Sequence, residues 1–457
     1  MKDVQPYIPD IKNSLQERNM NDISAILSHI PAVDLVEVWE EYKEDDRLIL
    51  FKVLDFDKKI EVFERLQFEQ QTEIMDGITS NRLADILNEM ASDERADLFE
   101  HLPAEEVEKL FSMMKEKEVE DVKDLMEYDE STAGGVMTTE FLALDPEMTS
   151  REALIKLQES VNSKEVRNIY ALYVVNIEGL VTGGLSLQRL ISARPDQKIS
   201  EIAKDVSRYL VNVNIDQEEV ARVFTHYDLL QAPVVDDSGR LLGVITIDDI
   251  VDVIHEEATE DIAKMAGTES EELLSKSVFK IFRIRWPWLF ASWLGGLVAL
   301  AVIGAYEDTL MKAVAVASFI PVIMGMGGNI GVQSSIIVVR GLALGSIDLK
   351  NVGKTILKEI KVGLALGLSY GLLLGVVAHI RYGAENSPGA NFGLIGIVAG
   401  GGICLSMTLA ATLGALLPVL FKKINIDPAV ATGPIVTTSI DVIGLSAYFL
   451  LASLILF

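Results

Sequence analysis

The chain of 457 residues carries 68 acidic and 40 basic side chains, which gives a formal net charge of −28 at pH 7. These charges are unevenly distributed, because residues 1–285 hold 61 acids and 31 bases whereas residues 286–457 hold 7 acids and 9 bases. This contrast between the two parts excludes a single soluble domain. The acidic excess would repel phosphate groups and argues against nucleic-acid binding. A single cysteine, Cys404, excludes a disulfide framework within the chain and a cysteine-based zinc site.

Residues 1–130 are predicted to form an all-helical domain. Apolar residues recur there at three- and four-residue spacing, as in residues 83–114, with short polar turns and Pro103 between the helices. The first residues, MKDVQPYIPDIKNSL, contain no apolar core of signal-peptide length. We therefore expect this acidic part to remain in the cytoplasm.

Residues 131–255 contain an internal repeat. LYVVNIEGLVTGGLS at residues 172–186 matches APVVDDSGRLLGVIT at residues 232–246, which sets a period of 60 residues. Each copy reads as strand, turn, strand and helix, and Thr149 with Glu152 predicts a capping box for an earlier helix. The pattern resembles a tandem pair of cystathionine-β-synthase (CBS) domains, which are α/β modules that usually sense ligands. The sequence leaves the ligand open, and a nucleotide is possible.

Residues 256–285 are predicted to form a connecting helix that runs directly into the first membrane span. Between residues 248 and 272 there are ten acids and one base. In a helix, four of these acids form one stripe and two lie beside it: Asp249, Asp252, Glu256 and Glu260, then Glu257 and Asp261. Like charges at this spacing destabilise a helix unless cations screen them. The segment is either a solvated acidic face or, as we favour, a cation-sensitive regulator of the membrane part.

Residues 286–457 form the predicted membrane domain. Five runs are apolar enough to cross a bilayer as helices, namely residues 286–306, 313–339, 362–380, 386–421 (with the helix beginning near Phe392) and 428–457. The loops after the second and fourth runs are basic: Arg340, Lys350, Lys354, Lys358, Lys361, Lys422 and Lys423. The positive-inside rule places these loops and the acidic part in the cytoplasm and the C-terminus outside, in a cell (inner) membrane.

The fifth run contains a single charge, Asp441, with 13 uncharged residues of the run before it and 16 after it. A carboxylate at that depth costs on the order of several kcal/mol unless it faces water, a cation or a partner. Thr437 and Thr438 offer hydroxyl oxygens nearby. A protonated aspartic acid that bridges two helices is the alternative, but no Lys or Arg lies within the runs, so we favour a functional acid.

The second run contains PVIMGMGGNIGVQSS at residues 321–335. Pro321 has no backbone N–H to donate, and the glycines lower the stability of the helix. The segment therefore predicts irregular backbone that lines a hydrated path. Asn329 and Gln333 are four apart and share a face, so they are candidate pore-lining residues. Tight packing of small residues against a neighbouring helix is an equally weighted alternative.

Residues 321–335 resemble the second-helix signature of the MgtE family of magnesium channels, and DPAVATGPIVTTSID at residues 427–441 resembles its fifth helix. The helical residues 1–130 and YDESTAGGVMTTEF at residues 128–141 are also typical of that family. The resemblance implies a homodimer in which Asp441 contacts hydrated magnesium in the pore, beside Thr437 and Thr438. Gly433 stands where some relatives are expected to have a polar residue, so no side-chain ligand is expected there.

In that family, magnesium ions also bridge the connecting helix to the CBS pair and the N domain. The resemblance assigns the regulatory acids as Asp216, Glu218, Asp228, Asp249, Asp252, Glu257, Glu260 and Asp261, with Asp93 and Asp97 in the N domain. Asp93 and Asp97 are four apart on one helical face. Oxygen ligands without a His–Cys cluster suit magnesium better than zinc or copper.

The sequence thus predicts a multidomain membrane protein with an α-helical N domain, a tandem α/β CBS pair, a connecting (plug) helix and a five-helix transmembrane pore domain. We expect a homodimeric, magnesium-selective channel that closes when cytoplasmic magnesium is high. No nucleophile–base arrangement or phosphate loop is present, so we do not expect an enzyme. Two alternatives remain, a CBS-gated transporter of another divalent cation such as cobalt or calcium, and a membrane-anchored sensor that conducts nothing.

Overall fold

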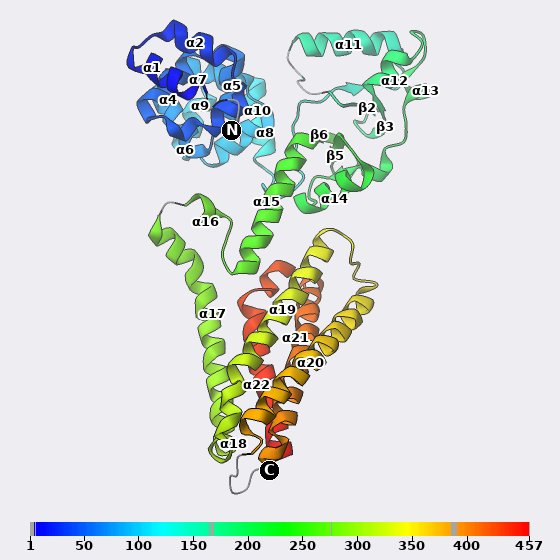
Figure 1. Cartoon of the computed structure of the whole chain (residues 1–457). Coiled ribbons are helices and arrows are strands. Elements are labelled where there is room, and N and C mark those ends of the chain that lie inside the picture. The colour runs from blue at the N-terminus through cyan, green and yellow to red at the C-terminus, as the bar shows by residue number, and fades with distance from the viewer. Residues whose placement is uncertain are drawn as a thin grey trace. The chain divides into compact units, whose positions relative to one another are not determined.

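The computed structural model describes residues 4, 6–163, 166, 169–275, 277–384 and 391–456 (Figure 1). The chain divides into two compact units, unit 1 (Met1–Val253) and unit 2 (Ile254–Phe457). The predicted fold class is confirmed, since helices, a pair of small sheets and five apolar helices follow one another in the expected order. The four ranges predicted from the sequence remain a finer division than these two units.

Unit 1 begins with short helices that pack around an apolar core. The core includes Trp39, Phe51, Phe63 and Phe99, all of them fully buried. Most of the helices are separated by a few residues only, so each buries one apolar face against its neighbours. They are α1 (Ile8–Gln16), α2 (Met20–Ser28), α3 (Ala32–Glu37), η1 (Trp39–Glu41), α4 (Glu44–Val53), α5 (Phe56–Arg65), α6 (Phe68–Gly77), α7 (Ser80–Glu89), α8 (Ser92–Glu100), α9 (Ala104–Phe111) and α10 (Glu116–Leu125).

Two three-stranded sheets follow in unit 1. In each, the first two strands are parallel and the last two are antiparallel. The first sheet has β1 (Ala143–Leu144), β2 (Ala171–Val175) and β3 (Val181–Ser186), and the second has β4 (Val211–Asn212), β5 (Gln231–Val235) and β6 (Leu241–Thr246). Their helices are α11 (Ser150–Asn162), α12 (Leu187–Ser192), α13 (Ile199–Ile202), η2 (Ser207–Tyr209) and α14 (Gln217–Tyr227).

The two sheets repeat one register 60 residues apart. Tyr173 pairs with Gly184 in the first hairpin and Pro233 with Val244 in the second, and each hairpin shifts register after its fourth pair. The hairpin turns use Gly179 and Gly239 at φ 81° and 86°, a region that suits glycine. The predicted repeat is therefore confirmed. The capping box at Thr149 is also confirmed, because Thr149 and Glu152 exchange hydrogen bonds at the start of α11.

The connecting segment is not the single helix that we expected. Helix α15 (Ile247–Ala266) ends where Gly267 adopts φ 76°, and α16 (Glu271–Leu274) follows before the first span begins. A residue in the left-handed region ends an α-helix, and glycine does so at little cost. The prediction of a helix that continues into the first span is therefore wrong.

Unit 2 contains five helical segments that are long and apolar enough to cross a membrane, as predicted. They are α17 (Val278–Ala305), η3 (Val314–Phe319) with α19 (Ile320–Ala343), α20 (Val352–Tyr382), α21 (Ile395–Lys423), and η5 (Pro428–Ala431) with α22 (Pro434–Leu456). Two short helices, α18 (Glu307–Lys312) and η4 (Phe392–Leu394), lie between them. Residues 386–390 and Phe457, which open and close two predicted runs, lie outside the described residues.

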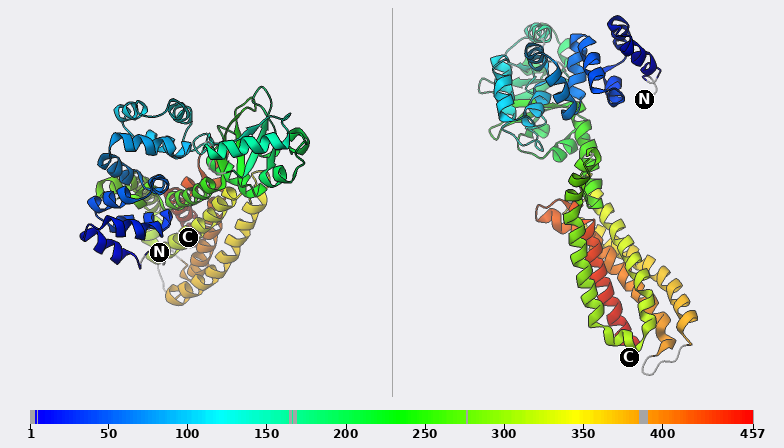
Figure 2. Two further views of the ribbon diagram at one scale, coloured as in Figure 1. Left: turned by 90° about the horizontal axis from the view of Figure 1, so that it is seen from above. Right: turned by 90° about the vertical axis from the view of Figure 1, so that its left-hand side faces the viewer.

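Helix α21 is the centre of unit 2, because α19, α20 and α22 all pack against it (Figure 2). Its buried face carries Ile403, Met407 and Ala411, and α20 approaches it through glycines. A side chain at Gly363 or Gly367 would place its Cβ 2.7–2.8 Å from atoms of α21. Backbone therefore meets backbone along the α20–α21 seam, as in small-residue packing of membrane helices.

Candidate ion path and acidic pocket

Asp441 lies in the middle of α22 and is only partly exposed. No hydrogen bond or ion pair joins its carboxylate to another described residue. Thr437 and Thr438 donate their hydroxyls to backbone carbonyls one turn earlier, Gly433 O at 3.2 Å and Pro434 O at 2.6 Å respectively. Those hydroxyls retain acceptor capacity for water or an ion.

Helix α19 presents one polar face that is not covered within the chain. Asn329 and Gln333 are both exposed there, four residues apart, as the sequence predicted. The next residues point inward instead, where Ser334 donates to Glu359 at 2.8 Å and Ser335 lies 3.0 Å from the hydroxyl of Thr432. An open amide face on a membrane helix is suited to contact water, an ion or a second chain.

The glycines of α19 do not break the helix. Pro321 lies in its first turn, where no backbone donor is needed, and α19 continues to Ala343. Gly327 and Gly331 are buried, and a Cβ on Gly331 would lie 2.0 Å from Ile440 Cδ1 of α22. The expectation of irregular backbone is therefore wrong at this segment, and close packing explains these two glycines. Gly325 and Gly328 have no heavy atom within reach of a Cβ, so packing does not explain them.

Glu359 on α20 is a second carboxylate, besides Asp441, within the five described candidate membrane spans, and the sequence interpretation missed it. Its side chain is 4% exposed and accepts the hydrogen bond from Ser334. One signal was available, because Gly363 lies four residues further along the same face and that face packs inward. The flanking lysines had suggested a wholly solvated loop.

A pocket of about 760 Å³ in unit 1, the acidic pocket, gathers carboxylates from separate helices. Three predicted regulatory acids line it, namely Asp93 on α8 and Asp249 and Asp252 on α15. The sequence interpretation did not assign the remaining acids, four of which are far from the predicted ones in the chain and two of which adjoin them: Glu37, Glu61, Glu64 and Glu140, then Glu94 and Asp248. Arg65 also contributes to the lining.

Buried polar contacts hold α8 at this pocket. Arg95, 1% exposed, pairs with Glu118 at 2.6 Å and donates to Leu87 O at 3.0 Å. Ser92 lies 2.9 Å from the hydroxyl of Thr138, which ties α8 to the segment before the first sheet. Asp93 and Glu94 therefore project from a helix whose position is held by buried polar contacts.

Burial and crowding raise the pKa of two carboxyls in the acidic pocket. The pKa of Glu94 is raised to about 9, first by burial and then by the neighbouring Asp93 and Glu64. The pKa of Asp249 is raised to about 7 by burial and by Asp93, against the opposing hydrogen bond from Thr246 at 2.6 Å. A cation in the pocket would favour the charged forms of both acids.

The other predicted acids of unit 1 lie outside the lining of the acidic pocket. Asp97 lies on α8, Asp216 caps α14 by accepting from the Glu218 N–H at 2.9 Å, and Glu218 pairs with Arg222 at 2.9 Å. Asp228 ends α14 in the left-handed conformation, at φ 52°. The structure therefore brings together only part of the predicted regulatory set.

Glu257, Glu260 and Asp261 lie on the part of α15 that belongs to unit 2. One turn further, Lys264 pairs with Glu260 and with Asp427 at 2.6 Å. Burial alone would lower the pKa of Lys264, but the hydrogen bonds to Asp427 and Glu260 outweigh it, so the pKa is raised. Asp427 opens the recognised fifth-helix segment, yet the sequence interpretation gave it no role.

Gly433 lies where the end of α15 approaches the start of α22. A Cβ at this position would be 3.0 Å from Met265 O, closer than most side chains tolerate. A Cβ on Gly267 would lie 3.3 Å from the ring of Pro434. The space left by Gly433 therefore serves this close contact within unit 2, which gives the departure at Gly433 a structural role.

No cluster of three or more His, Cys, Asp or Glu side chains in metal-binding geometry occurs within the described ranges. This is compatible with magnesium, which keeps several waters and is held through few direct carboxylate contacts.

A second pocket of unit 1, of about 550 Å³, lies within the CBS pair and is called the CBS cleft here. Its lining combines aromatic and basic side chains, including Tyr170, Tyr209, Arg189 and Lys204. Asp228 also lines it. Flat rings for stacking together with cationic groups suit a ligand that has an aromatic base and phosphates.

Three family descriptions match successive parts of the chain: the MgtE intracellular N domain at residues 30–131, the CBS domain at residues 188–256, and the divalent cation transporter MgtE at residues 320–451. The magnesium transporter MgtE of Thermus thermophilus is 37% identical over 334 residues, which is 73% of this chain and 72% of that protein. The magnesium transporter MgtE of Enterococcus faecalis is 37% identical over 333 residues, 73% of this chain and 71% of that protein.

Solved structures resemble the cytosolic part. The cytosolic domain of the Mg²⁺ channel MgtE in complex with ATP matches with a TM-score of 0.51 and 34% identity, covering 53% of this chain and 98% of that one. The soluble part of a magnesium transporter matches with a TM-score of 0.51 and 29% identity, covering 56% of this chain and 100% of that one.

Proposed function

The chain belongs to the MgtE family of divalent cation transporters, and from this premise we propose that it is a homodimeric magnesium channel whose cytoplasmic acids sense magnesium and close the pore. MgtE proteins are transporters and not enzymes, so the proposed activity is ion transport without a catalytic step. The basic loops after α19 and α21 support the proposal that α15 and unit 1 lie on the cytoplasmic side of a cell membrane.

The observation that carries the pore proposal is the partly buried carboxylate of Asp441 in the middle of an apolar helix. A charge there is costly unless water or a cation faces it, and no described residue supplies a bond. In a homodimer two copies of Asp441 would face one path, with Asn329 and Gln333 on the uncovered side of α19. Because magnesium loses its water reluctantly, these groups would contact the hydrated ion.

The acidic pocket supports the proposed regulation. Two charged carboxylates about 4 Å apart repel by roughly 4 kcal/mol at an effective dielectric of 20, so a crowded set favours separation when magnesium is scarce. Magnesium would screen Asp93, Asp249 and Asp252 and hold their helices together. Helix α15 extends from this pocket into unit 2, where it carries Glu257, Glu260 and Asp261. Asp97, Asp216, Glu218 and Asp228 are proposed as further regulatory ligands on the family resemblance alone.

Magnesium flux into proteoliposomes tests the whole proposal. The full chain should admit magnesium, driven by the membrane potential at about 2.3 kcal/mol per elementary charge per 100 mV. Cobalt hexammine, which mimics hydrated magnesium and does not dehydrate, should compete. Larger flux of cobalt or calcium would favour the transporter of another cation, and absence of any flux would favour the non-conducting sensor.

The CBS cleft supports a second ligand, a nucleotide. A related cytosolic domain was solved in complex with ATP, and the cleft here has the aromatic and basic lining that such a ligand needs. We propose that a nucleotide occupies it and modifies the magnesium response. Titration of the full chain with ATP, with Arg189→Gln as the weakened variant, should give saturable binding that the variant loses.

A further inference from the structure

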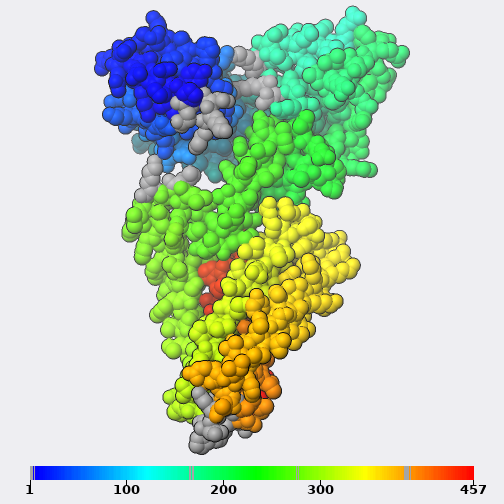
Figure 3. All heavy atoms as spheres, in the orientation of Figure 1, coloured from blue at the N-terminus to red at the C-terminus, as the bar shows by residue number. Residues whose placement is uncertain are grey.

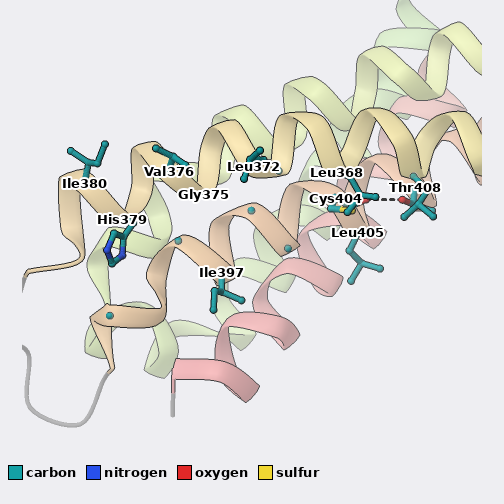
Figure 4. Close-up of a pocket in the computed structure, with 16 residues that line it drawn as sticks. Leu368, Leu372, Gly375, Val376, His379, Ile380, Ile397, Cys404, Leu405 and Thr408 are labelled. Carbon is teal, nitrogen blue, oxygen red and sulfur yellow. Dashed lines mark hydrogen bonds between the residues drawn. The ribbon is translucent and has the colours of Figure 1, made fainter.

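Helices α20 and α21 enclose a long apolar groove of about 1040 Å³ on the surface of unit 2 (Figure 4). Its walls are Leu368, Leu372 and Val376 from α20 and Ile397 and Leu405 from α21. The wall residues are open to the surroundings, as Leu372 is 71% exposed. Figure 3 shows the yellow and orange atoms of α20 at the surface along much of its length.

The groove exists because glycines form its floor. A Cβ on Gly371 would lie 2.6 Å from Gly400 O, and one on Gly375 would lie 2.8 Å from Gly396 O. The two helices therefore touch through their backbones, and no side chain fills the seam between the apolar walls. The floor is fixed by close packing and the walls are flexible leucine and isoleucine side chains.

Three lysines continue the same face of α20 toward its start. At about 100° per residue, Lys354, Lys358 and Lys361 share the helix face on which Leu368 and Leu372 lie. All three lysines are exposed, and no ion pair involves them in the part of the chain that the structure describes. Glu359, the nearest acid in sequence, is buried on the other side against Ser334. The stripe therefore keeps its positive charge.

The spacing of charge and groove matches one lipid leaflet. The part of the groove nearest the lysines, from Lys361 to Leu372, rises about 16 Å, roughly half of the ~30 Å hydrocarbon core. The groove then continues along α20 to Ile380. A positive group at the membrane surface with an apolar channel below it fits a phosphate headgroup with an acyl chain. Anionic lipids are attracted by about 1 kcal/mol per nearby lysine.

We propose that the lysine stripe and the groove form a binding site for one anionic phospholipid, with its phosphate at Lys354, Lys358 and Lys361 and an acyl chain between α20 and α21. This goes beyond the proposed transport function and uses from it only the orientation, which names the cytoplasmic leaflet. A second copy of the chain is the less suitable occupant. Two copies in one membrane are parallel, so a symmetric contact here would bring lysine stripe against lysine stripe.

Native mass spectrometry of the delipidated full chain tests the site with phosphatidylglycerol and phosphatidylcholine as probes. Phosphatidylglycerol should bind with one tight site, and Lys358→Gln/Lys361→Gln should weaken it about 30-fold, as expected for the loss of two lysines. The matched control Lys422→Gln/Lys423→Gln removes two charges from another basic loop and should leave this affinity unchanged. Equal binding of the two lipids, or equal weakening by both double variants, would overturn the proposal.

Crosslinking through Cys404, the sole cysteine, tests whether a lipid or a second copy of the chain occupies the groove. Cys404 lines it, so oxidation by copper phenanthroline in the membrane reports whether a second copy lies there. No Cys404–Cys404 dimer is expected, and a photoactivatable phosphatidylglycerol should crosslink to α20 and α21. A quantitative disulfide dimer would assign the groove to a second copy, and crosslinks confined to other helices would also refute the lipid site.

Discussion

The acidic pocket of unit 1 gathers many carboxylates around a cavity of about 760 Å³, whereas α22 of unit 2 holds the single acid Asp441 among apolar residues. In the pocket, each added cation relieves several repulsions, so the response is graded by concentration and shared among residues. In the proposed pore, Asp441 is the only carboxylate that α22 offers to an ion. Neutralising an acid should therefore have a large effect in α22 and a partial one in the pocket.

The largest effect is expected at Asp441. Asp441→Asn keeps the shape of the side chain and removes its charge, so magnesium flux into proteoliposomes should fall by about 100-fold or more, the factor that a loss of about 3 kcal/mol in ion binding gives. Ser446→Ala is the control, because Ser446 lies on the same helix, donates its hydroxyl to Val442 O at 2.7 Å and has no proposed contact with the ion. Its flux should stay within about twofold of the unaltered protein. Normal conduction by Asp441→Asn would remove the pore assignment.

The acidic pocket should show a smaller, shared effect. In patch recordings with magnesium varied on the cytoplasmic face, Asp249→Asn/Asp252→Asn should raise the half-closing concentration about tenfold, within the usual range of coupling between sites. The matched control Glu178→Gln/Asp196→Asn changes two exposed acids of the CBS pair away from the pocket. An unchanged midpoint in the pocket variant would place the sensor elsewhere, and deletion of residues 1–250 should abolish closure altogether.

The response should also depend on pH, because acids in the pocket hold protons. A carboxyl whose pKa is raised in the folded protein binds more protons than in the unfolded chain, so stability without magnesium falls as pH rises toward the raised value. Magnesium displaces those protons, and its affinity should rise about tenfold from pH 6 to 8, where Asp249 with a pKa of about 7 ionises.

Calorimetry in two buffers of different ionisation enthalpy measures the proton release on magnesium binding. Glu94→Gln removes the carboxyl whose pKa is raised to about 9, so it should release fewer protons than the unaltered protein. Glu178→Gln should not alter the release. Identical proton release in all three proteins would show that Glu94 does not titrate with magnesium.

The smallest effect is expected for the partly exposed pair of Lys264 and Asp427. Lys264→Gln should lower the melting temperature of the full chain in detergent by about 1–3 °C, since such pairs contribute about 0.2–1 kcal/mol. The loss should vanish in about 1 M salt, where charges are screened within about 3 Å. Asp427→Asn added to Lys264→Gln should cost nothing more, and additive losses would show that the two residues act separately.

Local patterns in the sequence predicted the repeat, the capping box and the five spans because each depends on neighbouring residues. Features that depend on distant partners were missed. The glycines of α19 were expected to loosen it, but Ile440 and Ser406 fill the space beside Gly331 and Gly327. Gly267 ends α15 by adopting a left-handed backbone conformation. The prediction missed this end because it followed the run of acids before Gly267 as one continuous helix.

The acidic pocket was predicted only in part, because its lining also depends on residues that are distant in the sequence. Asp93, Asp249 and Asp252 were carried over from a recognised family, whereas Glu61, Glu94 and Glu140 reach the pocket only through folding. Glu359 was hidden among lysines whose side chains point the other way. A buried acid and exposed bases can lie on opposite faces of one helix, and the composition of the segment does not reveal which of them is buried.

The shared register of the two CBS sheets relates the acidic pocket to the CBS cleft, because equivalent positions of the two copies line the two pockets. Positions 60 residues apart are equivalent, so Asp249 corresponds to Arg189, Asp252 to Ser192 and Asp248 to Gln188. One set lines the acidic pocket and the other lines the CBS cleft. Equivalent positions of the two copies therefore carry acidic side chains in the second copy and basic or polar ones in the first, so the same helix face offers negative charge to one pocket and positive charge to the other.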